Sequence, residues 1–154
     1  MKMKIPLFQV DAFTRNLFGG NPAAVCPMRV WPEAHVMQSI AAENNLSETA
    51  FLSGGAGRYR LRWFTPAVEI DLCGHATLAA AHVLFEHLGH PGPAITFETR
   101  SGALTVKRTG DVLEMDGVVV EPAFGQIVHA VAALAGVEHV GDQHGVVVAG
   151  DLDA

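Results

Sequence analysis

The sequence has few of the features that mark membrane, secreted or nucleic-acid-binding proteins. Its 154 residues include two cysteines, and its 10 basic residues are outnumbered by 16 acidic ones, for a formal charge of −6. A basic surface for nucleic acid is therefore not expected. No apolar run of about 18 residues occurs, which argues against a membrane span, and no apolar signal segment follows the charged N-terminus. These absences favour a cytoplasmic protein.

Metal-binding patterns are also missing. Cys26 and Cys73 lie far apart in the sequence and are expected to be reduced thiols. The eight histidines include no HExxH pair, and no CxxC pair occurs. The sequence therefore predicts no metal site.

What is present is enough apolar sequence for a globular core, since 49% of the residues are hydrophobic. Alternation and turn residues predict strands at 4–13, 23–26, 49–53, 58–65, 68–72, 95–98, 104–107, 112–115 and 146–148. Helical spacing predicts helices at 32–45, 75–88 and 126–135. Segment 75–88 is apolar around most of its circumference, which predicts a central buried helix.

The strand at 58–65 places three arginines, Arg58, Arg60 and Arg62, on one face. A solvated sheet face and an anion-binding face both fit this pattern. The ordinary alternation of a half-buried strand favours the first.

Two positions could carry chemistry. Glu48 lies between apolar residues where a helix gives way to a strand, and partial desolvation would raise the pKa of its carboxyl group toward the range that a general acid/base needs. The turn Cys73-Gly74-His75 precedes the buried helix, whose free N–H groups could hold a carboxylate. The structural alternatives are that Glu48 is a surface or capping glutamate and that the Cys73-Gly74-His75 turn is an ordinary strand-to-helix turn with a polar cap. Cys73 could be a nucleophile or a carbon acid/base, but a buried packing role is favoured because Cys26 has no matching context.

Five ordered segments carry a family resemblance. They are Val10-Asp11-Ala12-Phe13, Gly20-Asn21-Pro22-Ala23-Ala24-Val25, Asn45-Leu46-Ser47-Glu48-Thr49-Ala50-Phe51, Arg62-Trp63-Phe64-Thr65-Pro66 and Asp71-Leu72-Cys73-Gly74-His75-Ala76-Thr77-Leu78-Ala79. Together they resemble the N-terminal half of the phenazine-biosynthesis (PhzF-like) isomerase family, from about residue 5 to about residue 115.

The resemblance implies an α+β fold of the diaminopimelate epimerase type, with a curved mixed β-sheet wrapped around a central buried helix. It implies an isomerase that moves a proton between carbons of a small carboxylate-bearing metabolite, without metal or organic cofactor. The family's catalytic glutamate falls on Glu48, and its substrate-binding turn falls on Gly74 and His75. Ser47 and Asn21 match positions near the substrate. The resemblance is compatible with a homodimer.

Members of the family are nearly twice as long, and their second half contributes a motif of the Glu-Asp-Pro-Ala-Thr-Gly-Ser type that this sequence does not contain. The expected organisation is an N-terminal domain at 1–120 and the start of an incomplete second domain at 121–154. The leading hypothesis is an isomerase seen as an N-terminal portion. A non-catalytic half that binds small anions or a partner is the alternative, and a Cys73-dependent racemase is a weaker one.

Overall fold

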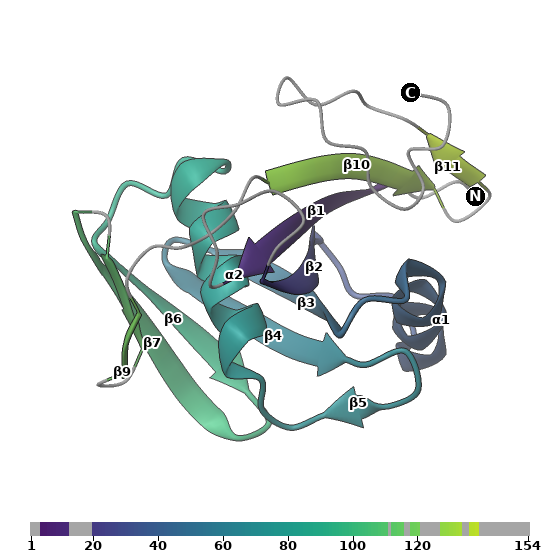
Figure 1. Cartoon of the computed structure of the whole chain (residues 1–154), viewed down its shortest axis with the longest axis horizontal. Helices are drawn as coiled ribbons and strands as arrows, with labels where there is room; N and C mark the ends of the chain where they lie inside the picture. The colour runs from purple at the N-terminus through teal and green to yellow at the C-terminus, as the bar shows by residue number, and fades with distance from the viewer. Residues whose placement is uncertain are drawn as a thin grey trace.

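A computed structural model describes residues 4–12, 20–110 and 112–115, together with the backbone of 118–120, 127–133 and 136–138. The described elements form one curled β-sheet with a helix against each of its faces (Figure 1). The helices are α1 (Ala34–Asn44) and α2 (Gly74–Glu86). The strands are β1 (Lys4–Ala12), β2 (Asn21–Pro27), β3 (Glu48–Gly55), β4 (Arg58–Phe64), β5 (Glu69–Ile70), β6 (Ala94–Thr99), β7 (Gly102–Thr109), β8 (Val112–Met115), β9 (Val118–Val120), β10 (Ile127–Ala133) and β11 (Gly136–Glu138).

The sheet is mixed, with strand order β11-β10-β1-β2-β3-β4-β6-β7-β8-β9, and β5 extends it beside β4. Two neighbouring pairs are parallel, β2 with β3 and β4 with β6. Parallel neighbours need a crossover connection. The chain supplies α1 for the first crossover and α2 for the second.

Helix α2 fills the concave side of the sheet, as the sequence predicts. Nine of its 13 residues are buried. Four of them are alanines, whose small side chains allow the sheet to approach the helix closely. The inward-facing strand residues of this core include Phe8, Val10, Ala23, Val25, Ala50, Leu52, Leu61 and Trp63. This packing confirms the expected curved sheet around a buried helix.

Helix α1 covers the outer face through Met37 and Ala41. They pack against Cys26, Phe51 and Phe64, which are the outward-facing residues of β2, β3 and β4. Both cysteines of the chain are free thiols. Complete burial raises the pKa of Cys26 far above its ordinary value. No helix in the described part of the chain is long and apolar enough to cross a membrane.

The arginine stripe of β4 lies on the outer face, as its alternation indicates. Arg62 forms a bidentate ion pair with Glu69, with N···O distances of 2.7 and 2.8 Å, and Arg58 pairs with Glu98 at 2.7 Å. The Arg60 guanidinium stacks over Trp31 at 4.4 Å from the ring centre. The arginines therefore have structural partners, and the anion-binding interpretation is not needed.

The expected helix at 126–135 is wrong. Residues 127–133 form strand β10, which pairs antiparallel with β1 from Lys4↔Ala133 to Val10↔Ile127. The segment is rich in β-branched residues, and it covers the edge that β1 would otherwise leave unpaired. The expected strand at 68–72 shortens to the two residues of β5, and the expected strand at 146–148 lies outside the described residues.

Gly54 gives a test of the β3–β4 hairpin. It has φ +151°, and a Cβ there would meet the Arg58 carbonyl oxygen at 2.3 Å. Gly54→Ala is therefore expected to lower the free energy of unfolding by about 1–3 kcal/mol. Gly55→Ala is the matched control, because nothing lies within 4 Å of a Cβ at Gly55. Urea titration of both variants checks the difference, and equal midpoints would contradict it.

His82 gives a pH test. Burial in α2, followed by the nearby charges of His87 and Arg108, lowers the pKa of His82 from 6.5 to about 4. Between these values the unfolded chain binds a proton that the folded chain does not, so stability falls as the pH drops from about 6.5 towards 4. We expect the lowered pKa of His82 to account for a loss of up to about 3 kcal/mol in the free energy of unfolding over this pH range. Urea unfolding at pH 7 and pH 4.5 should show a smaller loss for His82→Gln than for the wild type, and equal losses would contradict it.

Candidate functional site

Glu48 is placed by the turn between α1 and β3. Helix α1 ends at Asn44 and is capped by Asn45, which has the left-handed φ of 51° and donates its N–H to Ala41 O at 3.1 Å. The Asn44 side chain then donates to Thr49 Oγ1, also at 3.1 Å. This bond ties the end of α1 to the start of β3, so Glu48, the first residue of that strand, has a fixed backbone position.

His75 lies in the first turn of α2. Thr77, which is fully buried, donates both its N–H and its hydroxyl to Cys73 O, at 3.1 and 2.7 Å, and so closes the turn. Two contacts from the β6–β7 turn hold the loop that precedes α2. Ser101 Oγ donates to Asp71 O at 2.6 Å, and Arg100 pairs with the Asp71 carboxylate at 3.3 Å. The Cys73-Gly74-His75 turn is therefore anchored on both sides.

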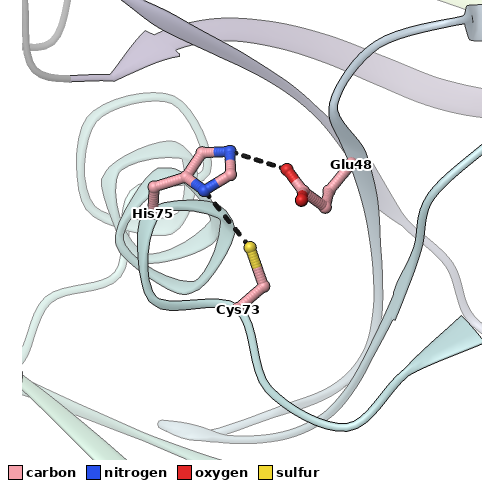
Figure 2. Close-up of side chains that lie close together, drawn as sticks. All are labelled: Glu48, Cys73 and His75. Carbon is pink, nitrogen blue, oxygen red and sulfur yellow. Dashed lines mark hydrogen bonds and ion pairs between the residues drawn. The ribbon is translucent and has the colours of Figure 1, made fainter.

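The imidazole of His75 lies between Glu48 and Cys73 (Figure 2). His75 Nε2 is 2.9 Å from Glu48 Oε2, and His75 Nδ1 is 3.2 Å from Cys73 Sγ. The side chains of Glu48 and His75 are 17% and 11% exposed. Neither Glu48 Oε2 nor His75 Nε2 has a hydrogen-bond partner in the described part of the chain, so the pair is a close contact and not an aligned hydrogen bond. Glu48 and the turn at the start of α2, the two positions that the sequence singles out, therefore lie in contact.

The N-terminus of α2 places backbone donors next to this contact. The helix ladder begins with the Thr77 N–H, so the N–H groups of Gly74, His75 and Ala76 precede it, and no side chain among the described residues caps them. The first turn carries no acidic residue. A Cβ at Gly74 would meet Met115 Cε at 3.5 Å, an ordinary van der Waals contact. The helix dipole favours an anion here.

Cys73 holds its proton tightly. Burial raises the pKa of the thiol to about 11, although the backbone N–H groups of Ala76 and His75 act in the opposite direction. The Glu48 carboxylate raises the pKa further. At neutral pH the thiol is therefore protonated, and it is not primed as a nucleophile.

Glu48, Cys73 and His75 are residue types that also bind metals, and their polar atoms lie within 4.8 Å of one another. The contacts, however, go to different nitrogens of one ring, with Glu48 at Nε2 and Cys73 at Nδ1. A metal ion bound to Nε2 would lie away from Cys73, which faces Nδ1. An ion bound to Nδ1 would lie away from Glu48, which faces Nε2. As arranged, the Cys73 thiol is hydrogen-bonded to one ring nitrogen, and the Glu48 carboxyl group lies close to the other.

The other predicted site residues lie at the same end of the sheet. Asn21 begins β2, two residues before Ala23, which pairs with Glu48, and Ser47 directly precedes Glu48. Neither side chain forms a hydrogen bond within the described residues. The sequence interpretation missed the contact of Cys73 with the ring. The one signal for it was the Cys-x-His spacing at a helix start.

A cavity of about 590 Å³ lies at the opposite end of α2, away from this cluster. It is lined by Leu84 near the end of α2, by Leu88 just beyond the helix, and by the ends of β2 and β3. Lys4 and Arg29 also line it. Leu84 is nine residues beyond His75, or about 14 Å along the helix axis. This cavity and the Glu48–His75 cluster are therefore two separate places among the described residues where a ligand could bind.

The curled mixed sheet around α2 is the α+β fold of the diaminopimelate epimerase type. The chain belongs to the phenazine biosynthesis-like protein family (PhzC-PhzF), whose family model matches residues 10–136.

Three similar proteins illustrate the relationship. A Pseudomonas aeruginosa protein named as an uncharacterized isomerase is 60% identical over 114 residues, which are 74% of this chain and 44% of that protein. A PhzF family crystal structure from Enterococcus faecalis matches with a TM-score of 0.69 and 50% identity, over 72% of this chain and 43% of that chain. A structure described as a predicted epimerase from Pseudomonas aeruginosa matches with a TM-score of 0.61 and 29% identity, over 72% and 42% of the two chains. The chain spans less than half the length of these proteins.

Proposed function

We propose that the chain is part of an isomerase that moves a proton between carbon atoms of a small carboxylate-bearing metabolite, with Glu48 as the acid/base and no cofactor. The observation that carries the proposal is the 2.9 Å contact between Glu48 and His75 beside the uncapped N-terminus of α2. This arrangement places a proton-transfer group next to an anion-binding group. The names of the relatives, an isomerase and an epimerase, support the same reaction class.

The substrate carboxylate is assigned to the N-terminus of α2. The N–H groups of Gly74, His75 and Ala76 would donate to its oxygens, and the helix dipole would add to their attraction. Asn21 and Ser47, at the same end of the sheet, are proposed to contact the rest of the substrate.

Glu48 is proposed to transfer the proton. Its carboxylate takes a proton from the carbon next to an electron-withdrawing group, and the electron pair of that C–H bond moves into the conjugated system of the substrate. The protonated Glu48 then returns the proton to another carbon, so the atoms and charges of substrate and product balance. His75, which contacts Glu48 Oε2 at 2.9 Å, would hold the carboxyl group in position for the transfer.

A thiol-based racemase is a second candidate, since Cys73 lies in the same cluster. A base must be deprotonated at the working pH, and the raised pKa of this buried thiol opposes that state. Glu48 is therefore preferred as the base.

The proposal is tested by incubating the chain in D₂O with a panel of small carboxylic acids that carry an activated C–H bond. Proton NMR of each acid should show loss of that C–H signal with the native chain and not with the heat-denatured chain. A non-catalytic binding protein would shift ligand resonances without exchanging any C–H proton, and that result would replace the isomerase proposal.

A further inference from the structure

The cavity at the far end of α2 has the size and the lining of a small-molecule site. Its volume of about 590 Å³ lies within the range of about 300–1,000 Å³ that is usual for such sites. Part of its lining is apolar and buried, since Ile5, Leu52 and Leu84 are at most 2% exposed. Val30 and Leu88 also line it, and they are two of the four large hydrophobic residues that are exposed in the described part of the chain. Apolar surface that gathers in this way is typical of a binding site.

The charge around the cavity favours an anion. The chain carries 16 acidic and 10 basic residues, yet the described residues that line the cavity include the basic residues Lys4 and Arg29 and no acidic one. Arg29 is exposed, and its guanidinium forms no ion pair within the described residues. A guanidinium matches a carboxylate in both charge and geometry. A ligand with an apolar body and one acidic group would therefore complement both parts of the lining.

The segment that carries Arg29 is held in place from β3. Met28 donates its N–H to Leu52 O at 2.8 Å, and Ser53 Oγ donates to Arg29 O at 3.0 Å. Ser53 is buried, so this second bond is shielded from water. This wall of the cavity is therefore formed before a ligand arrives, which lowers the cost of ordering it on binding.

We propose that this cavity binds a small organic carboxylate with a long aliphatic or aromatic body. The apolar body contacts Leu52, Leu84 and Leu88, and the carboxylate pairs with Arg29. No residue of the Glu48–His75 cluster lines the cavity, so this site is separate from the proposed acid/base and does not depend on the proposed function.

The test is amide NMR of the ¹⁵N-labelled 154-residue chain, titrated with three probes below their micelle concentrations. Decanoate carries the apolar body and the negative charge, acetate carries the charge alone, and decyltrimethylammonium carries the body with the opposite charge. We expect saturable shifts with decanoate at Arg29, Gly54 and Leu88, and weaker binding of the other two probes. Nuclear Overhauser contacts between the Leu84 methyl groups and the decanoate chain should place the apolar body in the cavity.

Arg29→Glu tests the charge. An exposed ion pair changes an affinity by about 1.4- to 5-fold, and reversal of the charge replaces the attraction by a repulsion of similar size. Decanoate should therefore bind about 2- to 25-fold more weakly to this variant. Lys107→Glu is the matched control, because it makes the same change of charge at an exposed residue that does not line the cavity. It should leave the affinity nearly unchanged, since salt screens a distant exposed charge.

Three results with the wild-type chain would overturn the proposal, and none of them depends on a variant folding. One is equal affinity for decanoate and decyltrimethylammonium. Another is the absence of saturable decanoate shifts at the cavity, with or without shifts at the start of α2. The third is a set of Overhauser contacts that show the cavity filled by another part of the chain. An Arg29→Glu protein with a native amide spectrum and wild-type affinity for decanoate would also overturn it.

Discussion

Replacing Glu48 with Gln is expected to lower the rate of C–H proton exchange by about 10²–10⁴-fold, the usual contribution of a positioned acid/base. Glutamine keeps the size of glutamate but cannot take up a proton from carbon. Substrate affinity should change much less, because the carboxylate would be held by the N–H groups at the start of α2. Exchange rates and ligand titrations by NMR measure the two effects separately.

The matched control is Glu43→Gln, which removes the same charge from an exposed position on α1. It should leave the exchange rate unchanged. If Glu48→Gln exchanges normally and Cys73→Ala is inactive, the glutamate mechanism is wrong, and the thiol would replace Glu48 as the base.

Replacing Trp63 with Ala is expected to cost about 3–5 kcal/mol of folding stability. Trp63 is 1% exposed and belongs to the core between β4 and α2, so its removal leaves a cavity against the helix that carries His75. Chemical unfolding of the variant should show the loss as a shift of the urea midpoint. The packing around His75 should become less ordered in the same variant.

Trp63→Phe separates packing from hydrogen bonding. The Trp63 indole N–H is buried without a hydrogen-bond partner in the described part of the chain, so phenylalanine removes an unpaired donor while it keeps an aromatic ring in the core. We expect it to cost less than half of what alanine costs. An equal cost for the two variants would contradict the packing account.

Much of the fold could be predicted because its strongest signals are local. The apolar circumference of the segment from His75 onward predicts a buried helix, and α2 confirms it. The alternation in β4 predicts which face is buried, and Leu61 and Trp63 confirm it. The motif order predicts the family, and the family model confirms it.

The predictions that failed, or were not made, depend on contacts between distant segments. The spacing of apolar residues in 127–133 fits a helix, but the unpaired edge of β1 selects a strand. The contact of Cys73 with His75 depends on side-chain rotamers at a helix start, which residue spacing does not determine. The cavity at the far end of α2 is formed by the ends of several separate strands.

The most direct test of the central claim is a crystal structure of the chain with a carboxylic acid that it exchanges in D₂O. The account predicts the carboxylate within hydrogen-bond distance, about 2.7–3.2 Å, of N–H groups at the start of α2, with the exchanging carbon next to the Glu48 carboxylate. Binding in the cavity lined by Leu84, Leu88 and Arg29, with the Glu48 end of α2 unchanged, would contradict it.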